Sequence, residues 1–258
     1  GITSGDALLD AVCEAEISAL RSVMTPLDAG LFAELGADCA RAMEETCLSV
    51  KTGMSEFQIA GLLSARCFDL GIEPIVNLIA ADERVSLYRH PLPTEKRLKQ
   101  YAMLVLCGRR FGQVVSLTRF VAAGELPAEI LKKRNALHNL DALLFSETRP
   151  GALVGDILSR LCTAYADEGY ADEWKLHHQG GLAGYESREV KALPGCDLVV
   201  KSGQVYAWNP SITGYKSEDS FIVGVDENRI ITETRRFPYR KFEYKGLEFE
   251  RPEAMPIV

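Results

Sequence analysis

Residues 175–219 decide the fold, because they hold three short polar fragments in or beside predicted strands. The fragments are His177-His178-Gln179-Gly180-Gly181, Asn209-Pro210 and Glu218-Asp219. Runs of apolar and β-branched residues predict strands at 176–178, 205–209 and 218–225. Polar side chains on neighbouring strands of one sheet can line a common pocket. We therefore expect these fragments to meet in one site.

Two further fragments lie upstream. Ser116-Leu117-Thr118-Arg119 ends a predicted hairpin, and His90-Pro91-Leu92-Pro93-Thr94 precedes it. In this order the fragments resemble the catalytic domain of the pita-bread family, which includes methionine aminopeptidases, prolidases and creatinase. That family has Gly-His-Gly-Ile-Gly, Glu-Pro and Glu-Asp after a hairpin with two Asp residues, and an assisting His in a His-x-x-Pro-Thr segment. The resemblance spans about residues 22–226 and implies the pita-bread α+β fold.

The resemblance also identifies the positions where the family binds two metal ions. They are occupied here by Val105, Ser116, His178, Asn209 and Glu218. Two divalent cations bring four positive charges, which such sites balance with carboxylates. Glu218 is the single carboxylate in this set, and uncompensated charge in a partly buried cleft costs several kcal/mol per ion. We therefore expect no two-metal centre.

Composition narrows the classes of function. The 258 residues are 47% hydrophobic, enough for a substantial core, and carry a formal net charge of −7, which argues against nucleic-acid binding. No apolar run reaches the length of about 20 residues that a bilayer crossing needs. The seven cysteines are scattered without a Cys-x-x-Cys pair, so we expect reduced thiols and a cytoplasmic location. Cys107 and Cys162 lie in apolar stretches and are interpreted as buried thiols rather than nucleophiles.

An internal repeat supports the same architecture independently. An offset of 98 residues aligns Gly53 with Gly151 and Gly71 with Gly169. Each copy predicts two amphipathic helices followed by strands, with helices at 31–48 and 55–70, then 127–147 and 153–168. First-half strands are expected at 74–80, 104–107 and 112–119. We expect one domain over 1–258, with pseudo-repeats at about 22–124 and 125–226. The tail at 227–258 is interpreted as a loop or an edge strand. The two repeats together predict a curved, mainly antiparallel sheet backed by helices.

Three residues are predicted to be catalytic. His178 is expected to face the pocket, although a histidine bonded to a backbone carbonyl in the core is the alternative. Because side chains alternate along a strand, His177 should then point to the opposite face, and the two should not bind one ion. His90 is the second acid/base candidate, with a surface turn as its alternative. Glu218 is expected to orient the substrate, with an ion pair to Lys216 or Arg119 as the structural alternative.

Five residues are predicted to bind substrate: Asn209, Tyr185, Arg188, Ser116 and Arg119. Asn209 can donate and accept hydrogen bonds, and Arg188 can bind a carboxylate through its fork of donors. Tyr185 lies where the family has another substrate-facing His. A solvated loop with an internal Arg-Glu pair is the alternative for Tyr185 and Arg188, and a structural role is the alternative for Arg119.

Three functions remain open. The first is a hydrolase or lyase that works without metal on a small amino-acid-derived or peptide-like substrate. Creatinase is similar at His90 and Glu218, but Thr118 stands where creatinase has a catalytic Glu. The second is an enzyme with one divalent metal at His90, His178 and Glu218. The third is a non-catalytic peptide-binding module.

The resemblance adds two expectations about assembly. Catalytic relatives usually pair, which implies a homodimer. Prolidases and creatinase carry a domain before this one, and the chain opens with Gly1-Ile2-Thr3 rather than Met, so we expect a missing N-terminal domain.

Overall fold

The first half of the chain contains two long helices and an antiparallel sheet. In the computed structural model, the structure describes residues 13, 16–234 and 236–258; the opening Gly1-Ile2-Thr3 lies outside them. The elements are α2 (Pro26–Ser49), α3 (Glu56–Asp69), β1 (Glu73–Ala81), α4 (Arg84–Leu87), β2 (Tyr101–Arg110) and β3 (Gln113–Ala122). Helix α2 begins five residues before the predicted 31, because Thr25 and Asp28 form a capping box.

The second half repeats this order. Its elements are α5 (Ala128–Glu147), α6 (Val154–Asp167), the short 3-10 helix η1 (Glu173–Leu176), β4 (Gly180–Ala183), β5 (Val190–Lys191), β6 (Val205–Trp208), β7 (Ser211–Ile212), β8 (Tyr215–Lys216), β9 (Asp219–Ile222) and β10 (Arg229–Ile230). The glycines paired by the 98-residue offset share a left-handed backbone: φ is +90° at Gly53 and +91° at Gly151, and +68° at Gly71 and +87° at Gly169. Both copies therefore use the same glycine turns around the second helix.

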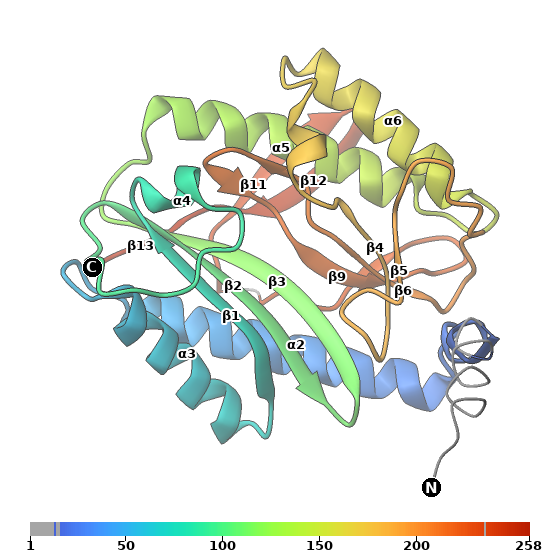
Figure 1. Ribbon diagram of the computed structural model, residues 1–258, viewed down its shortest axis with the longest axis horizontal. Helices are drawn as coiled ribbons and strands as arrows, with labels where there is room; N and C mark the ends of the chain where they lie inside the picture. Colours follow the sequence, from blue (N-terminus) through green and yellow to red (C-terminus); the bar gives the residue numbers. More distant parts are fainter. Residues whose placement is uncertain (1–12, 14–15, 235) are drawn as a thin grey trace, which may run out of the picture.

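The strands lie in a central layer between two pairs of helices, with α2 and α3 on one side and α5 and α6 on the other (Figure 1). One sheet has the order β1-β2-β3-β13, in which β13 is Met255–Pro256, and the other has the order β10-β9-β6-β4-β5. A bridge between Thr118 and Glu218 joins the two sheets where β3 approaches β9. This mixed architecture confirms the predicted α+β fold, and it brings the hairpin β2-β3 beside the Glu218 segment.

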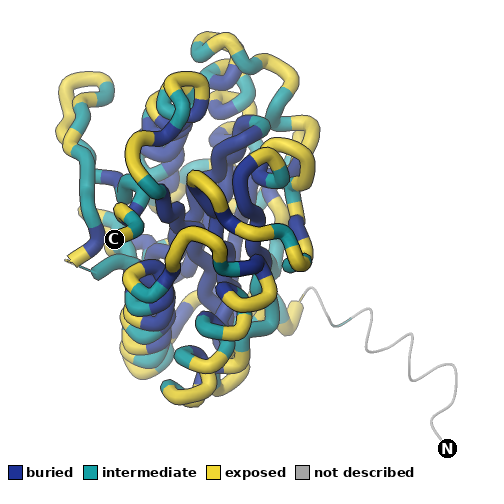
Figure 2. The backbone as a smooth tube through the Cα atoms, turned by 90° about the vertical axis from the view of Figure 1, so that its left-hand side faces the viewer, coloured by how far each residue is buried: buried dark blue, intermediate teal, exposed yellow. Residues whose placement is uncertain are grey.

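Strand β2 is buried on both faces. Met103 and Val105 belong to the core that includes α5 and α6, whereas Leu104 and Leu106 belong to the core that includes α2 and α3. Figure 2 shows the same pattern, with buried backbone in the centre and exposed residues on loops and outer helix faces. Two buried faces explain why β2 reads as a continuous apolar run, and they fix which side chains face the pocket.

The tail forms more structure than the sequence predicts. Strands β11 (Tyr239–Tyr244) and β12 (Leu247–Pro252) make a hairpin, and β13 (Met255–Pro256) pairs with β3 as an edge strand. The edge-strand part of the interpretation is confirmed. The hairpin was missed, and it carries Arg251, whose guanidinium contacts the carboxylates of Asp141 and Asp219 in the interior.

The predicted strand at 176–178 is wrong. Residues up to Leu176 form η1, and regular pairing begins at Gly180. His177 and His178 therefore lie in an unpaired segment, which has consequences for the site. Among the described residues, no helix combines the length and apolar character needed to cross a membrane.

Candidate functional site

A cavity of about 300 Å³ opens where β2, the segment before β4 and the segment before β9 meet. Its polar lining includes His90, His178, Arg188, Asn209, Lys216 and Glu218, and its apolar wall includes Val76, Leu78 and Val105. A second cavity of about 660 Å³ lies next to it and shares Glu186 and Arg188 with it. The smaller cavity is the candidate site because it collects five of the predicted residues from segments far apart in the chain.

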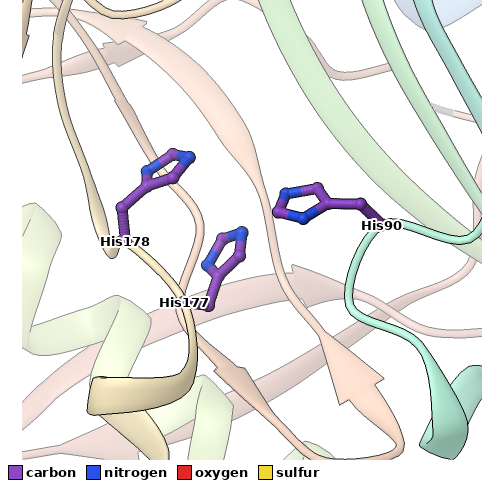
Figure 3. A group of neighbouring side chains, drawn as sticks. All are labelled: His90, His177 and His178. Carbon is purple, nitrogen blue, oxygen red and sulfur yellow. The ribbon is translucent and has the colours of Figure 1, made fainter.

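Three histidines cluster here (Figure 3): His90 and His178 line the cavity, and His177 lies beside them. His90 reaches in from the loop after α4, and His177 and His178 come from the segment between η1 and β4. Their ligand nitrogens all lie within 4.8 Å of one another, and the rings of His177 and His178 stack with centroids 4.6 Å apart. The expectation that His177 points away from His178 is therefore wrong, because alternation of side chains holds only along a regular strand.

The histidines are held in their neutral form. Burial, together with the nearby charge of Lys216, lowers the pKa of His177 to about 2. Burial also lowers the pKa of His178 to about 4, with Arg188 contributing, and lowers that of the more exposed His90. Within the described part of the chain, both ring nitrogens of His177 and Nδ1 of His178 are buried without a hydrogen-bond partner. Neutral imidazoles with open nitrogens can accept a proton or bind a metal ion.

Glu218 is enclosed by hydrogen-bond donors. Its Oε2 lies 2.7 Å from Nζ of Lys216 and 2.9 Å from Oγ1 of Thr118, and its Oε1 lies 3.0 Å from Nη2 of Arg188. Burial alone would raise the pKa of Glu218, but Lys216, Arg188 and the hydrogen bonds lower it to about 2. Glu218 is therefore ionised at neutral pH, and both of its oxygens are engaged by side chains of this chain.

Arg188 connects two of the metal-ligand positions. Its Nη2 donates to Glu218, and its Nη1 lies 3.3 Å from Oγ of Ser116. Ser116 also contacts Sγ of Cys107 at 3.2 Å, and these two residues are direct partners across the hairpin. A guanidinium group thus contacts two of the side chains at positions where, by the resemblance, the family binds metal.

Asn209 lies at the end of β6. Its backbone N–H donates to the carbonyl of Gln179 at 3.0 Å, which joins it to the histidine segment. The residue is 3% exposed, and Oδ1 is buried without a partner among the described residues. An unpaired buried acceptor that lines a cavity is available to a ligand N–H.

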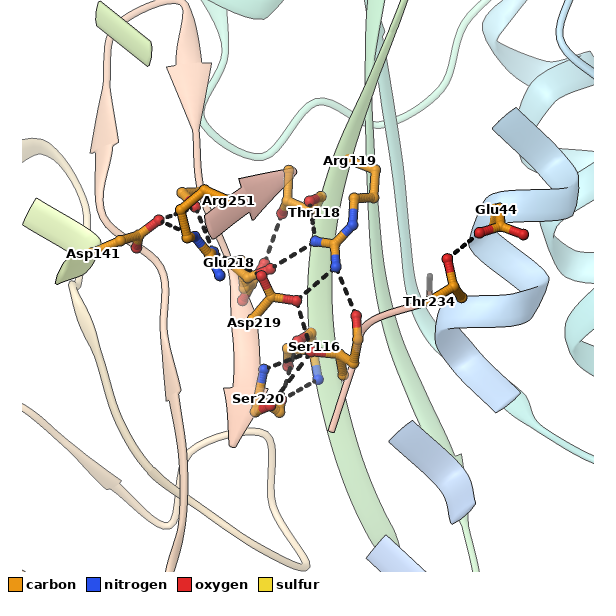
Figure 4. A network of polar contacts seen from close by, with 12 residues as sticks. Glu44, Ser116, Thr118, Arg119, Asp141, Glu218, Asp219, Ser220, Thr234 and Arg251 are labelled. Carbon is orange, nitrogen blue, oxygen red and sulfur yellow. Dashed lines mark hydrogen bonds and ion pairs between the residues drawn. The ribbon is translucent and has the colours of Figure 1, made fainter. Parts of the chain in front are cut away.

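Three predicted substrate-binding residues do not line the cavity. Ser116 is buried, and its hydroxyl contacts Arg188 instead. Arg119 donates to Asp219 at 2.7 Å and to the carbonyl of Thr232, behind the pocket (Figure 4). Tyr185 places its hydroxyl 3.5 Å from Asp28 on the first turn of α2. Neither lines the 300 Å³ cavity. The structural alternative holds for Arg119, and Tyr185 is directed toward the first repeat because its loop packs against Gly112.

Three residues were missed as parts of the site. Lys216 was considered only as a structural partner of Glu218, Cys107 only as a buried thiol, and His177 was assigned to the wrong face. The sequence held a signal for Cys107: the two-residue turn Phe111-Gly112, with φ of +53° and +83°, fixes the register that pairs Cys107 with Ser116.

The residues present do not fit a two-metal centre. Val105 has no donor atom, Ser116 and Asn209 are neutral, and the oxygens of Glu218 already accept from Lys216, Thr118 and Arg188. The three histidines fit one transition-metal ion in donor type. Three nitrogens on tetrahedral zinc lie about 3.3 Å apart, so the cluster would have to contract. The planes of His177 and His178 differ by only 20°, so one ring would also have to rotate.

Known structures share this fold. Prolidase from Pyrococcus furiosus superimposes with a TM-score of 0.78 at 18% identity, covering 86% of this chain and 68% of that chain. The Xaa-Pro dipeptidase from Bacillus anthracis gives 0.78 at 18%, covering 99% and 72%. The X-Pro aminopeptidase from Thermotoga maritima gives 0.77 at 18%, covering 86% and 65%. The chain thus spans about two thirds of the length of these proteins, and the likeness establishes the fold.

Sequence comparison identifies the family. A search of curated protein sequences finds no match to this chain. The sequence profile of metallopeptidase family M24 matches residues 31–233, which include the candidate site and both helix pairs except the start of α2. The fold and the family resemblance are both confirmed, and the chain belongs to metallopeptidase family M24.

Proposed function

We propose that this protein is a peptidase-type hydrolase that acts on a small amino-acid-derived or peptide-like substrate without a metal centre. One observation carries the proposal: Arg188 contacts Ser116 and Glu218, two positions where relatives would bind metal, and Lys216 contacts Glu218 as well. Side-chain cations thus supply the positive charge that divalent ions would bring. The cavity of about 300 Å³ has the size of a small-molecule site.

The proposed chemistry is acid/base catalysis by neutral histidines. His90 lines the cavity and is exposed, so its imidazole can take a proton from an attacking water. The proton taken by His90 then passes to the leaving amine as the C–N bond breaks, and His178, which also lines the cavity, can hydrogen-bond to that leaving group. Glu218 acts through its partners, because it fixes the positions of Arg188 and Lys216. Asn209 offers its unpaired Oδ1 to a substrate N–H.

Turnover after metal removal tests the proposal. Protein dialysed against chelator is screened with dipeptides, N-acyl amino acids and amino-acid amides, alongside His90→Ala. We expect hydrolysis to survive chelation and to fall at least a hundredfold in the variant, in line with the usual contribution of general acid/base catalysis. Hydrolysis that is lost on chelation and restored by manganese or zinc refutes metal independence.

A one-metal peptidase is the second candidate. The clustering of His90, His177 and His178 favours this candidate. His177 takes the place of Glu218 in the expected ligand set, because the carboxylate of Glu218 is already engaged by Lys216 and Arg188. Elemental analysis of protein purified without chelator separates the two candidates. A stoichiometric ion that His177→Ala removes would establish this second candidate and exclude the first.

We extend the proposal to a cytoplasmic homodimer. The support is the resemblance to paired relatives and the scattered, unpaired thiols; the cysteines are free in the described part of the chain. Light scattering coupled to size-exclusion chromatography measures the mass directly. A monomeric mass of 28.4 kDa at micromolar concentration refutes the dimer.

A further inference from the structure

The inner end of the cavity carries an excess of positive charge. Arg188, Lys216 and Glu218 have side chains that are 5%, 7% and 3% exposed, respectively. Among the described residues, Glu218 is the one carboxylate that contacts either cation. Two buried cations therefore face one buried carboxylate, which leaves one positive charge in excess. Buried charge without a partner is costly, so this arrangement favours an anionic ligand.

Hydrogen-bond donors remain open at the same place. The ammonium group of Lys216 has three donors, of which the contact with Glu218 engages one. Nε of Arg188 is buried and has no partner in the described part of the chain. Both side chains line the cavity, and the guanidinium is held in place by Glu218 and Ser116. A preorganised guanidinium beside an ammonium matches the geometry of carboxylate recognition.

We propose that this cavity binds the free carboxylate of a small monoanionic ligand against Arg188 and Lys216. One excess charge matches a monoanion, whereas a phosphate dianion would leave the buried site negative. The remaining wall indicates the rest of the ligand: Val76, Leu78 and Val105 suit an apolar group, and Oδ1 of Asn209 suits an amide N–H. The ligand class is thus an N-acyl or amide-containing amino acid. The inference rests on the proposed function only in calling this ligand a substrate.

Direct binding tests the inference without any turnover. N-acetylglycine and its neutral amide, N-acetylglycinamide, are titrated calorimetrically in chelator-treated protein in Tris chloride. We expect the acid to bind at least tenfold more tightly than the amide, and this preference to fall as KCl is raised, because chloride screens and competes for the cations. Lys216→Met should abolish the preference and Lys216→Arg should keep it. Lys175→Met, which alters an exposed ion pair with Asp172, should leave it unchanged.

Several outcomes would overturn the inference. Equal binding of acid and amide by the wild-type protein would do so, and so would a preference that is insensitive to salt or that survives in Lys216→Met. A preference that requires added zinc or manganese would assign the cation to a metal instead. If Lys216→Met does not fold, the salt dependence and the acid-to-amide ratio of the wild-type protein decide. Carboxylate binding without hydrolysis of any substrate would refute the proposed function and leave this inference standing.

Discussion

Replacing Glu218 with glutamine should cost far more stability than replacing its neighbour Lys216 with methionine. Glu218→Gln leaves Arg188 and Lys216 buried without their carboxylate, and breaking a buried pair from one side costs about 3–5 kcal/mol. Lys216→Met leaves Arg188 and Glu218 as a balanced pair and removes the excess charge, so we expect a change within about 1 kcal/mol. The double variant should lie between the two, because one unpaired cation remains.

Urea unfolding followed by tryptophan fluorescence measures these differences, since the chain has two tryptophans. With a slope of about 3 kcal/mol per molar urea, the midpoint of Glu218→Gln should fall by about 1–2 M. Lys175→Met is the matched control, because its ion pair with Asp172 is solvent-exposed and should contribute less than about 1 kcal/mol. A Glu218→Gln midpoint equal to that of the control, or a greater loss in Lys216→Met, would refute the buried charge imbalance.

Three further perturbations test other parts of the structure. Arg251→Met should cost about 3–5 kcal/mol in urea unfolding, because it leaves the buried carboxylate of Asp141 without a cation and that of Asp219 with Arg119 alone. A midpoint shift no larger than that of an exposed control would contradict the network. Burial lowers the pKa of His138 to about 3, so the unfolded chain binds a proton more readily than the folded one. The stability that neutral His138 contributes should be complete above about pH 6.5 and should be lost progressively toward pH 3. His138→Gln should flatten this pH dependence of the unfolding free energy by about 1.4 kcal/mol per pH unit, which urea unfolding at several pH values measures. Gly181→Ala places a Cβ 2.2 Å from the carbonyl oxygen of Val190 at a φ of +144°, so it should lower the melting temperature strongly. Gly61→Ala, at a helix position where a Cβ meets no atom within 4 Å, should raise the melting temperature slightly. Equal effects of the two substitutions would refute the close approach at Gly181.

The helices and most strands follow from local chemistry that the sequence displays. Capping residues, apolar spacing and glycine turns act within a few residues, which is why both helix pairs could be predicted to within a few residues at most ends. The predicted strand at 176–178 failed because three residues are too short a pattern to identify a strand, and the local chain ends a 3-10 helix at Leu176. The hairpin of the tail had a local signal that the sequence analysis did not use, the two-residue turn Lys245-Gly246 with φ of +50° and +79°. Its contacts with α5 and with Asp219 are long-range and have no local signal.

The candidate site, too, could be predicted in part and not in full. Motif order indicated which residues approach one another, and the structure brings His90, His178, Asn209 and Glu218 to one cavity. Side-chain direction was harder to predict. The sequence does not show that Arg188 turns inward while Tyr185 turns toward α2, because that choice depends on how one loop packs between two repeats.

The charge arrangement also explains how this cavity keeps its shape with few of the carboxylates found in relatives. In a metal centre the ions join strands from both halves by binding their side chains. Here Thr118 of β3 donates to Glu218, and Arg188 joins Ser116 of β3 to that same carboxylate. Hydrogen bonds from the chain's own cation and hydroxyl thus connect the two halves across the bridge at Thr118 and Glu218. Loss of Glu218 should therefore loosen the contact between β3 and β9, and amide hydrogen exchange in Glu218→Gln should rise first on these two strands. Uniform exchange across both sheets would show that the core packing, rather than this pair, holds the halves together.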